Sequence, residues 1–172
     1  MKIVKKYTNE GVKNIRNDII DILGLGRDVL RSLEKKLSSP SEIEFANLKK
    51  NNESIGVALF NFDLECVKIL SDKKLDDNDV RLVIGGNRLV INIEKMVTKI
   101  LKLLTEYKNV ANPSYIDKIL KITDMVIASY DKLVIGFIYN EIQECYKIIA
   151  DDISIDKLRD TYTSEILQSI MK

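Results

Sequence analysis

The amino-acid sequence predicts an all-α protein, an elongated up-and-down bundle of about five long antiparallel helices. Two observations support this prediction. Apolar residues recur at intervals of three and four positions through most of the chain, which is the period of an amphipathic helix. The segments that interrupt this period are short and polar, and short connections place consecutive helices side by side in opposite directions. With 172 residues, the chain is long enough to form one domain with a substantial core.

The first helix is expected over residues 8–37. Its apolar residues follow the helical period throughout, at Ile15, Ile19, Ile22, Leu23, Val29, Leu30, Leu33 and Leu37. The run Ser38-Ser39-Pro40 then ends it, because proline cannot continue a helix and serine favours turns. Ser41, with Glu44 three residues later, forms a capping box that predicts a second helix over 42–70.

The remaining helices follow two further breaks. The acidic segment 76–79 supplies a turn and an N-cap, so a third helix is expected over 79–107. Asn112-Pro113 ends that helix, and a fourth is expected from 114 to about 150. Residues 151–154 form either a turn or a continuation, and a last helix extends to the chain end. The single helical domain 1–172 then consists of a three-helix repeat over 8–108 and an incomplete second repeat over 113–172.

The third helix has the most informative pattern. Alternating steps of four and three residues define an expected core seam, which consists of Val83, Asn87, Val90, Glu94, Val97, Leu101 and Leu104. Asn87 and Glu94 are polar positions on that seam, and buried polar groups require partners. We expect Asn87 to fix the helix register and Glu94 to pair with a neighbouring lysine or tyrosine, with a ligand or metal role as the alternative.

One side of the third helix is consistently basic. Its residues recur every seven positions, at Arg81, Arg88, Lys95 and Lys102. Such a row is typical of a solvated helix face. The alternative is a docking surface for an acidic partner.

Composition excludes several function classes. The net charge is +1, from 27 basic and 26 acidic residues, which gives no electrostatic reason to expect nucleic acid as a partner. The sequence contains no histidine, which removes Ser-His and Cys-His nucleophile pairs, histidine-ligated zinc and Glu-x-x-His di-iron sites. No paired constellation of the other reactive side chains stands out, so we expect a non-enzymatic protein.

The sequence also bears on location. No apolar run approaches the ~18 residues of a membrane span, and no apolar region follows the basic N-terminus. We therefore expect a cytoplasmic protein that is at most peripheral to a membrane. Cys66 and Cys145 lie within helical patterns and are expected to be small buried residues in a reducing compartment. Gly24 and Gly26 match no nucleotide-binding motif and indicate a flexed helix or a close helix–helix approach.

A weak internal repeat relates the two halves of the chain. With an offset of about 99 residues, Glu42-Ile43 falls on Glu141-Ile142, and Glu53 falls on Asp152. The counterpart of the third helix would lie beyond residue 172. The pattern therefore predicts three helices followed by two, with the sixth helix of a double repeat missing.

Two segments resemble the PhoU family. The stretch DVRLVIGGNRLVINIEKMVTKI, residues 79–100, is similar to that family's third-helix pattern, Asp-Leu-Arg-Leu-Val followed by Asp-Leu-Glu-Arg-Ile-Gly-Asp. The residues that agree without a gap are Asp79, Arg81, Leu82, Val83 and Glu94. ADDISIDKL, residues 150–158, is similar to a second recurrent segment, Asp-x-x-Ile-Asp-x-Leu, through Asp152, Ile155, Asp156 and Leu158. The resemblance extends over nearly the whole chain.

This resemblance implies a regulator. PhoU proteins are cytoplasmic helical bundles that restrain phosphate uptake and phosphate-starvation signalling by contact with phosphate transporter components or a sensor kinase. Some bind iron or zinc clusters on acidic helix faces. The corresponding residues here are Glu53, Glu94, Asp152 and Asp156. Neutral residues replace further family acids at Asn92, Thr98 and Val57, which weakens a divalent site, so we expect no tightly held metal.

The missing helix also predicts an assembly state. It would leave an apolar face without its usual cover, formed by Ile119, Ile122, Val126, Leu133 and Phe137 on one helix and by Ile155, Leu158, Ile166 and Ile170 on the other. We expect a homodimer that buries this face. The competing arrangement is one closed five-helix bundle. A dimerising helical scaffold unrelated to phosphate is the alternative function.

Overall fold

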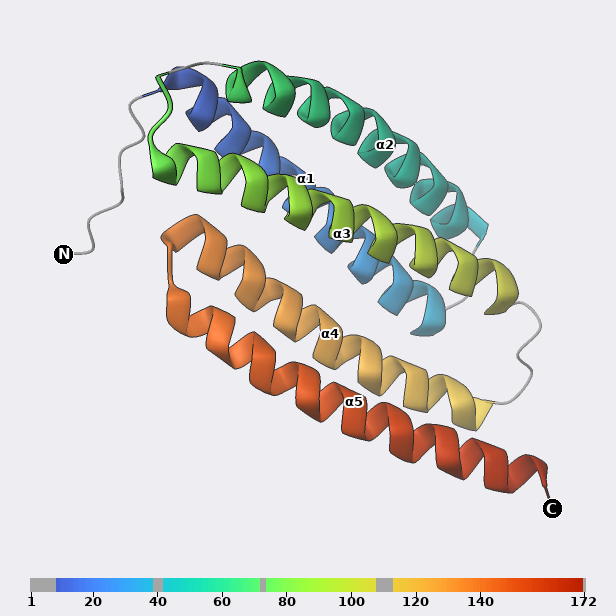
Figure 1. The fold of residues 1–172 in the computed structure, drawn as a ribbon. Helices are drawn as coiled ribbons and strands as arrows, with labels where there is room; N and C mark the ends of the chain where they lie inside the picture. Colours follow the sequence, from blue (N-terminus) through green and yellow to red (C-terminus); the bar gives the residue numbers. More distant parts are fainter. Residues whose placement is uncertain (1–8, 39–41, 72–73, 108–112, 172) are drawn as a thin grey trace.

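A computed structural model describes residues 9–38, 42–71, 74–107 and 113–171. Within these ranges it contains five helices and no strand, which confirms the all-α prediction. The helices are α1 (Glu10–Ser38), α2 (Glu42–Leu70), α3 (Asp77–Tyr107), α4 (Pro113–Tyr139) and α5 (Ile142–Ile170) (Figure 1). The capping box expected at Ser41 lies outside the described residues.

α1 is the central helix of the fold. It packs against α2, α3 and α4, and α2 also packs against α3. Consecutive helices run in opposite directions (Figure 1). The apolar residues predicted for the first helix are all buried in α1, where Val12 joins them. The long apolar stripe of this helix therefore forms the middle of the core.

α5 forms an edge of the molecule. It packs against α4 and against no other described helix, and none of its described residues is buried. Its half-buried residues must therefore face α4, and they follow a heptad row formed by Glu144, Ile148, Asp151, Ile155, Leu158, Tyr162 and Ile166. The five helices thus form an open array, and the closed five-helix arrangement is not adopted.

The buried seam of α3 differs from the predicted one. Val83, Val90, Val97 and Leu104 are buried as expected, but the positions between them are Gly86, Ile93 and Ile100. Asn87 is half-buried and Glu94 is exposed, so the prediction that both are buried polar groups is wrong. A step of three from each valine reaches an apolar residue or glycine, whereas a step of four reaches a polar residue at Asn87 and Glu94. The residue three positions after each valine is therefore the buried one, because this orientation of α3 avoids desolvating a polar side chain.

The last helix boundary also differs from the prediction. α4 ends at Tyr139 and α5 begins at Ile142, so no single helix extends to residue 150. The chain turns at Asn140, whose φ of 55° lies in the left-handed region that asparagine tolerates better than most residues. The Glu141 N–H then donates to the Gly136 carbonyl at 2.9 Å. The internal repeat, which aligned Glu141 with the start of the second helix, already indicated this position.

Gly26 allows α1 and α4 to approach closely. A Cβ at this position would overlap the Tyr130 hydroxyl and lie 3.0 Å from Cγ2 of Ile93. The Tyr130 hydroxyl donates a hydrogen bond of 3.0 Å to the Leu23 carbonyl, and burial raises the pKa of this phenol. Gly24 has no such neighbour within 4 Å of an added Cβ. A close helix approach therefore explains Gly26 and leaves Gly24 without a packing role.

Candidate functional site

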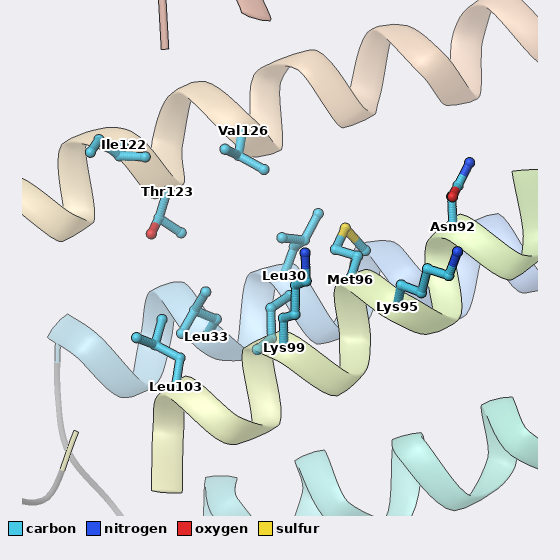
Figure 2. Close-up of a pocket in the computed structure, with 11 residues that line it drawn as sticks. Leu30, Leu33, Asn92, Lys95, Met96, Lys99, Leu103, Ile122, Thr123 and Val126 are labelled. Atoms are coloured by element: carbon cyan, nitrogen blue, oxygen red, sulfur yellow. The ribbon is translucent and has the colours of Figure 1, made fainter. Parts of the chain in front are cut away.

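A groove lies between α3 and α4, with α1 beneath it (Figure 2). Its volume is about 640 Å³, which is within the range of protein binding pockets. The lining residues are Leu30 and Leu33 from α1, Asn92, Lys95, Met96, Lys99, Ile100 and Leu103 from α3, and Ile122, Thr123 and Val126 from α4. Most of them are apolar, and the charged ones are both lysines.

One residue of the basic row of α3 lines this groove. Arg81, Arg88, Lys95 and Lys102 are all exposed. Lys95 lines the groove, and Lys99, one helical turn further on, lies beside it. Lys99 was not among the predicted docking residues, although its spacing from Lys95 could have indicated it. Lys102 is engaged in an interaction of its own and does not line the groove.

A second, smaller hollow lies between α4 and α5. Its volume is about 230 Å³, and it is lined by Val126, Ser129, Tyr130, Leu133, Ile148, Asp152 and Ile155. Val126 lines both the groove and this hollow. The same side of α4 therefore lines both openings, the groove toward α3 and the hollow toward α5.

The apolar face expected to lack cover is only partly open. On α4, Ile119, Ile122, Val126, Leu133 and Phe137 are each half-buried. On α5, Ile155, Leu158 and Ile166 are half-buried against α4, and Ile170 is exposed. Contacts of α4 with α1 and α5 therefore cover much of this face, and the groove and the hollow mark what remains open.

Two rows of exposed apolar residues lie along α2 and α5. The row on α2 consists of Val57, Phe60, Leu64 and Val67, which are 53% to 67% exposed. The row on α5 consists of Ile142, Tyr146, Ile149 and Ile153, which are 54% to 64% exposed. The row on α2 lies opposite that helix's buried residues Phe62 and Cys66. Helical periodicity could not single out these rows, because both helices are apolar on more than one side.

Polar contacts position α4 on α1. Arg27 Nε lies 2.8 Å from Asp131 Oδ1, and Arg31 Nη2 lies 3.2 Å from Asp131 Oδ2. Near the C-terminal end of α4, Arg16 Nη2 donates to the Ile138 carbonyl at 2.6 Å. These arginines reach across from α1 to α4 and were not identified from the sequence. The three arginines are spaced like the charged residues of an ordinary solvent-exposed helix face, so their positions in the sequence did not single them out.

Asp151 links α5 to α4. The Ser129 hydroxyl donates to Asp151 Oδ2 at 2.8 Å, and the Lys132 ammonium donates to the same oxygen. The hydrogen bond from Lys132, and then that from Ser129, lowers the pKa of this carboxyl below its usual range.

Acid is expected to loosen this link. A depressed pKa in the folded state stabilises the native arrangement above the unfolded pKa of about 4, and this contribution is lost as the pH falls through the folded pKa. Amide protection in α5 should therefore fall below about pH 4, and an Asp151→Asn variant should show reduced protection already at neutral pH. Hydrogen exchange read by mass spectrometry measures both. Asp160→Asn is the matched control, because Asp160 bonds to Arg159 within α5. Equal protection in the two variants would contradict the assigned role of Asp151.

The candidate metal ligands are not brought together. Glu53 and Glu94 are exposed on α2 and α3, whereas Asp152 and Asp156 are exposed on α5, which contacts neither helix. Asp156 is instead engaged by Arg159 Nη1 at 2.7 Å. Among the described residues, no group of three or more Asp, Glu, Cys or His side chains could hold a metal ion. A cluster that joins both repeats is not supported by this placement.

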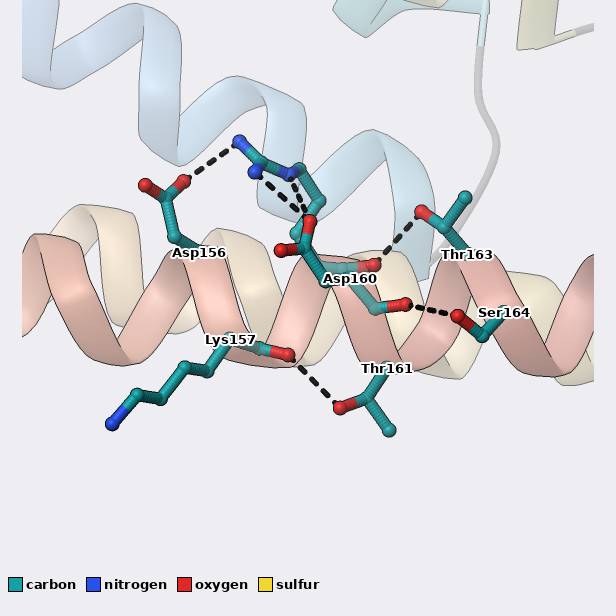
Figure 3. Close-up of polar contacts among 7 residues, drawn as sticks. Asp156, Lys157, Asp160, Thr161, Thr163 and Ser164 are labelled. Carbon is teal, nitrogen blue, oxygen red and sulfur yellow. Dashed lines mark hydrogen bonds and ion pairs between the residues drawn. The ribbon is translucent and has the colours of Figure 1, made fainter.

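Several polar side chains in the second half of α5 bond within the helix itself (Figure 3). Arg159 extends between Asp156 and Asp160. The hydroxyls of Thr161, Thr163 and Ser164 donate to carbonyls four residues earlier, at 2.8 to 2.9 Å. These hydroxyls and the Arg159 guanidinium are therefore already engaged within α5.

The two cysteines differ in environment. Cys66 is buried, and burial, followed by the nearby Asp63, raises the pKa of its thiol to about 11. Such a thiol stays protonated and is a poor nucleophile. Cys145 is exposed, so the prediction that both cysteines are buried is wrong for this residue.

None of the described helices contains a stretch long and apolar enough to cross a membrane. The resemblance to the PhoU family rests on the sequence motifs described above. Comparison of the chain with protein-family models, with curated proteins and with solved structures finds no match in any of the three.

Proposed function

We propose that this protein is a non-enzymatic regulator that acts by contact with other proteins, and that it regulates phosphate transport or the phosphate-starvation response. The observation that supports action by contact is the exposed apolar row on α2, in which four large side chains are more than half exposed. Monomeric proteins rarely leave contiguous apolar surface in water unless it is an interaction site.

The phosphate part of the proposal comes from the PhoU resemblance of residues 79–100 and 150–158. By that resemblance, the partners are phosphate transporter components or a membrane sensor kinase, contacted from the cytoplasmic side. The first of these segments lies in α3, the helix whose lysines border the groove. The proposed regulatory motif and the candidate docking surface are thus on the same helix.

Deletion of the gene tests the proposal. Phosphate uptake and transporter expression should rise under phosphate excess, where a restraining regulator normally acts. Wild-type protein should restore both, whereas Leu64→Ser/Val67→Ser should not, because it makes the row on α2 polar. Asn61→Ser is the matched control, since Asn61 is an exposed polar residue of the same helix. If uptake and expression stay at wild-type levels under both excess and starvation, the phosphate assignment is wrong.

A dimerising scaffold is the second candidate, and the exposed row on α5 favours it. A second copy of α5 could cover this row by an isologous contact. Sedimentation at micromolar concentration should show a species of twice the chain mass of 19.7 kDa. Ile149→Ser/Ile153→Ser should shift the protein to the monomer, and Gln143→Ser should not. A wild-type monomer that persists as the concentration rises would rule out the dimer.

A further inference from the structure

We infer that the groove between α3 and α4 is a docking site for a single amphipathic helix of a partner protein, one whose edge facing α3 carries acidic residues. This inference rests on the proposed function, regulation by protein contact, and specifies the chemistry of the partner. It needs neither the phosphate assignment nor a dimer.

The shape and lining of the groove favour a helix over other peptide conformations. An extended peptide binds by adding a strand to a sheet edge, and the described part of the chain contains no strand. A polyproline segment binds between aromatic side chains, and no aromatic residue lines this groove. An apolar groove between two helices instead accepts the apolar ridge of a third helix.

The dimensions suit about three helical turns. The α3 wall extends from Asn92 to Leu103, and residues at three-and-four spacing between them face the groove. At about 1.5 Å per residue this wall is roughly 16 Å long. Ile122 and Val126 of α4 form the opposite wall, and Val126 leads on into the hollow beside α5. A partner helix can therefore continue past the groove along α4.

The positive charge on the α3 wall of the groove predicts the charge on the edge of the partner helix that faces α3. Lys95 and Lys99 both lie on the α3 wall, and no acidic residue lines the groove (Figure 2). Arg27 and Arg31 of α1, by contrast, are paired with Asp131 of α4. Within the described structure, neither lysine forms an ion pair. Two adjacent unpaired lysines beside an apolar floor favour carboxylates on the incoming helix and disfavour ammonium groups.

The experiment uses a pair of designed helical peptides and the full-length protein. Both peptides have about sixteen residues and the same ridge of leucines at three-and-four spacing. One carries glutamates along one edge of the ridge, and the other carries lysines at those positions. Fluorescence anisotropy of labelled peptides measures binding at low salt and at about 150 mM salt.

We expect the acidic peptide to bind at least about tenfold more tightly than the basic one. Lys95→Glu/Lys99→Glu should reverse that preference, and added salt should reduce it. Lys121→Glu/Lys157→Glu is the matched control: it changes the net charge equally, at exposed lysines outside the groove, and should keep the wild-type preference. Leu64→Ser on α2 should leave binding unchanged, which excludes binding to the exposed row there.

Three results would each overturn the inference: equal affinity for the two peptides, no binding of the acidic peptide below about 1 mM, or wild-type binding by Lys95→Glu/Lys99→Glu. The outcome is separable from that of the proposed function. A deletion strain with normal phosphate handling, together with selective peptide binding, would remove the phosphate assignment and leave the docking site. A deletion strain with altered phosphate handling, together with equal binding of the two peptides, would remove the docking site and leave the phosphate assignment.

Discussion

Val90→Asp is expected to destabilise the protein by about 3–5 kcal/mol, because it places an uncompensated charge in the core. Val90 is 1% exposed on the buried seam of α3. The shallow hollow beside it, between α2 and α3, is lined by Asp63 and Glu94 and by no basic residue. A new carboxylate there would meet two like charges and no partner. The midpoint of urea denaturation followed by circular dichroism measures the loss.

Lys95→Ala is the control for this substitution. Lys95 is exposed on the same helix, so its truncation should change the free energy of unfolding by no more than about 0.5 kcal/mol. Equal midpoints for the two variants would mean that the seam assigned to α3 faces the wrong way.

Gly26→Ala and Gly24→Ala should shift stability in opposite directions, although the substitutions are identical and two residues apart. A methyl group at Gly26 would collide with the Tyr130 hydroxyl and separate α1 from α4, at a cost of about 1–3 kcal/mol. At Gly24 it would meet nothing, and the gain in helix propensity should stabilise the protein by up to about 1 kcal/mol. Denaturant midpoints measure both effects.

A double variant tests the mechanism. Because the collision involves the phenol oxygen, Tyr130→Phe added to Gly26→Ala should recover part of the lost stability. It cannot recover all of it, since the Leu23 carbonyl loses its hydrogen bond. If Gly26→Ala is as stable as Gly24→Ala, the close approach of α1 and α4 is not required for folding.

The fold was predictable where periodicity was unambiguous. The apolar stripe of α1 and the valines of the α3 seam follow from spacing alone, because a helix repeats every 3.6 residues and one side must be buried. Spacing failed for Asn87 and Glu94, because steps of three and of four from a valine both reach the same side of a helix. Spacing also failed to predict the break between α4 and α5 at Asn140, because the left-handed conformation of one residue does not change the local composition.

The candidate site was less predictable than the fold. The basic row of α3 was visible in the sequence, but the groove that Lys95 lines depends on which side of α4 packs against α1. That choice depends on partners distant in sequence, such as Arg31 with Asp131 and Gly26 with Tyr130. The exposed rows of α2 and α5 could not be predicted for a related reason. When a helix has two apolar sides, its sequence alone does not determine which of them is buried.

The central position of α1 has a consequence for the order in which the chain assembles during synthesis. α1 is synthesised before the other four described helices, and α2, α3 and α4 then pack against it in turn, each adding to a surface that already exists. α5 follows these four helices and packs only against α4 among them. A chain emerging from the ribosome can therefore bury apolar surface step by step, and no early segment has to wait for α5 before it can fold.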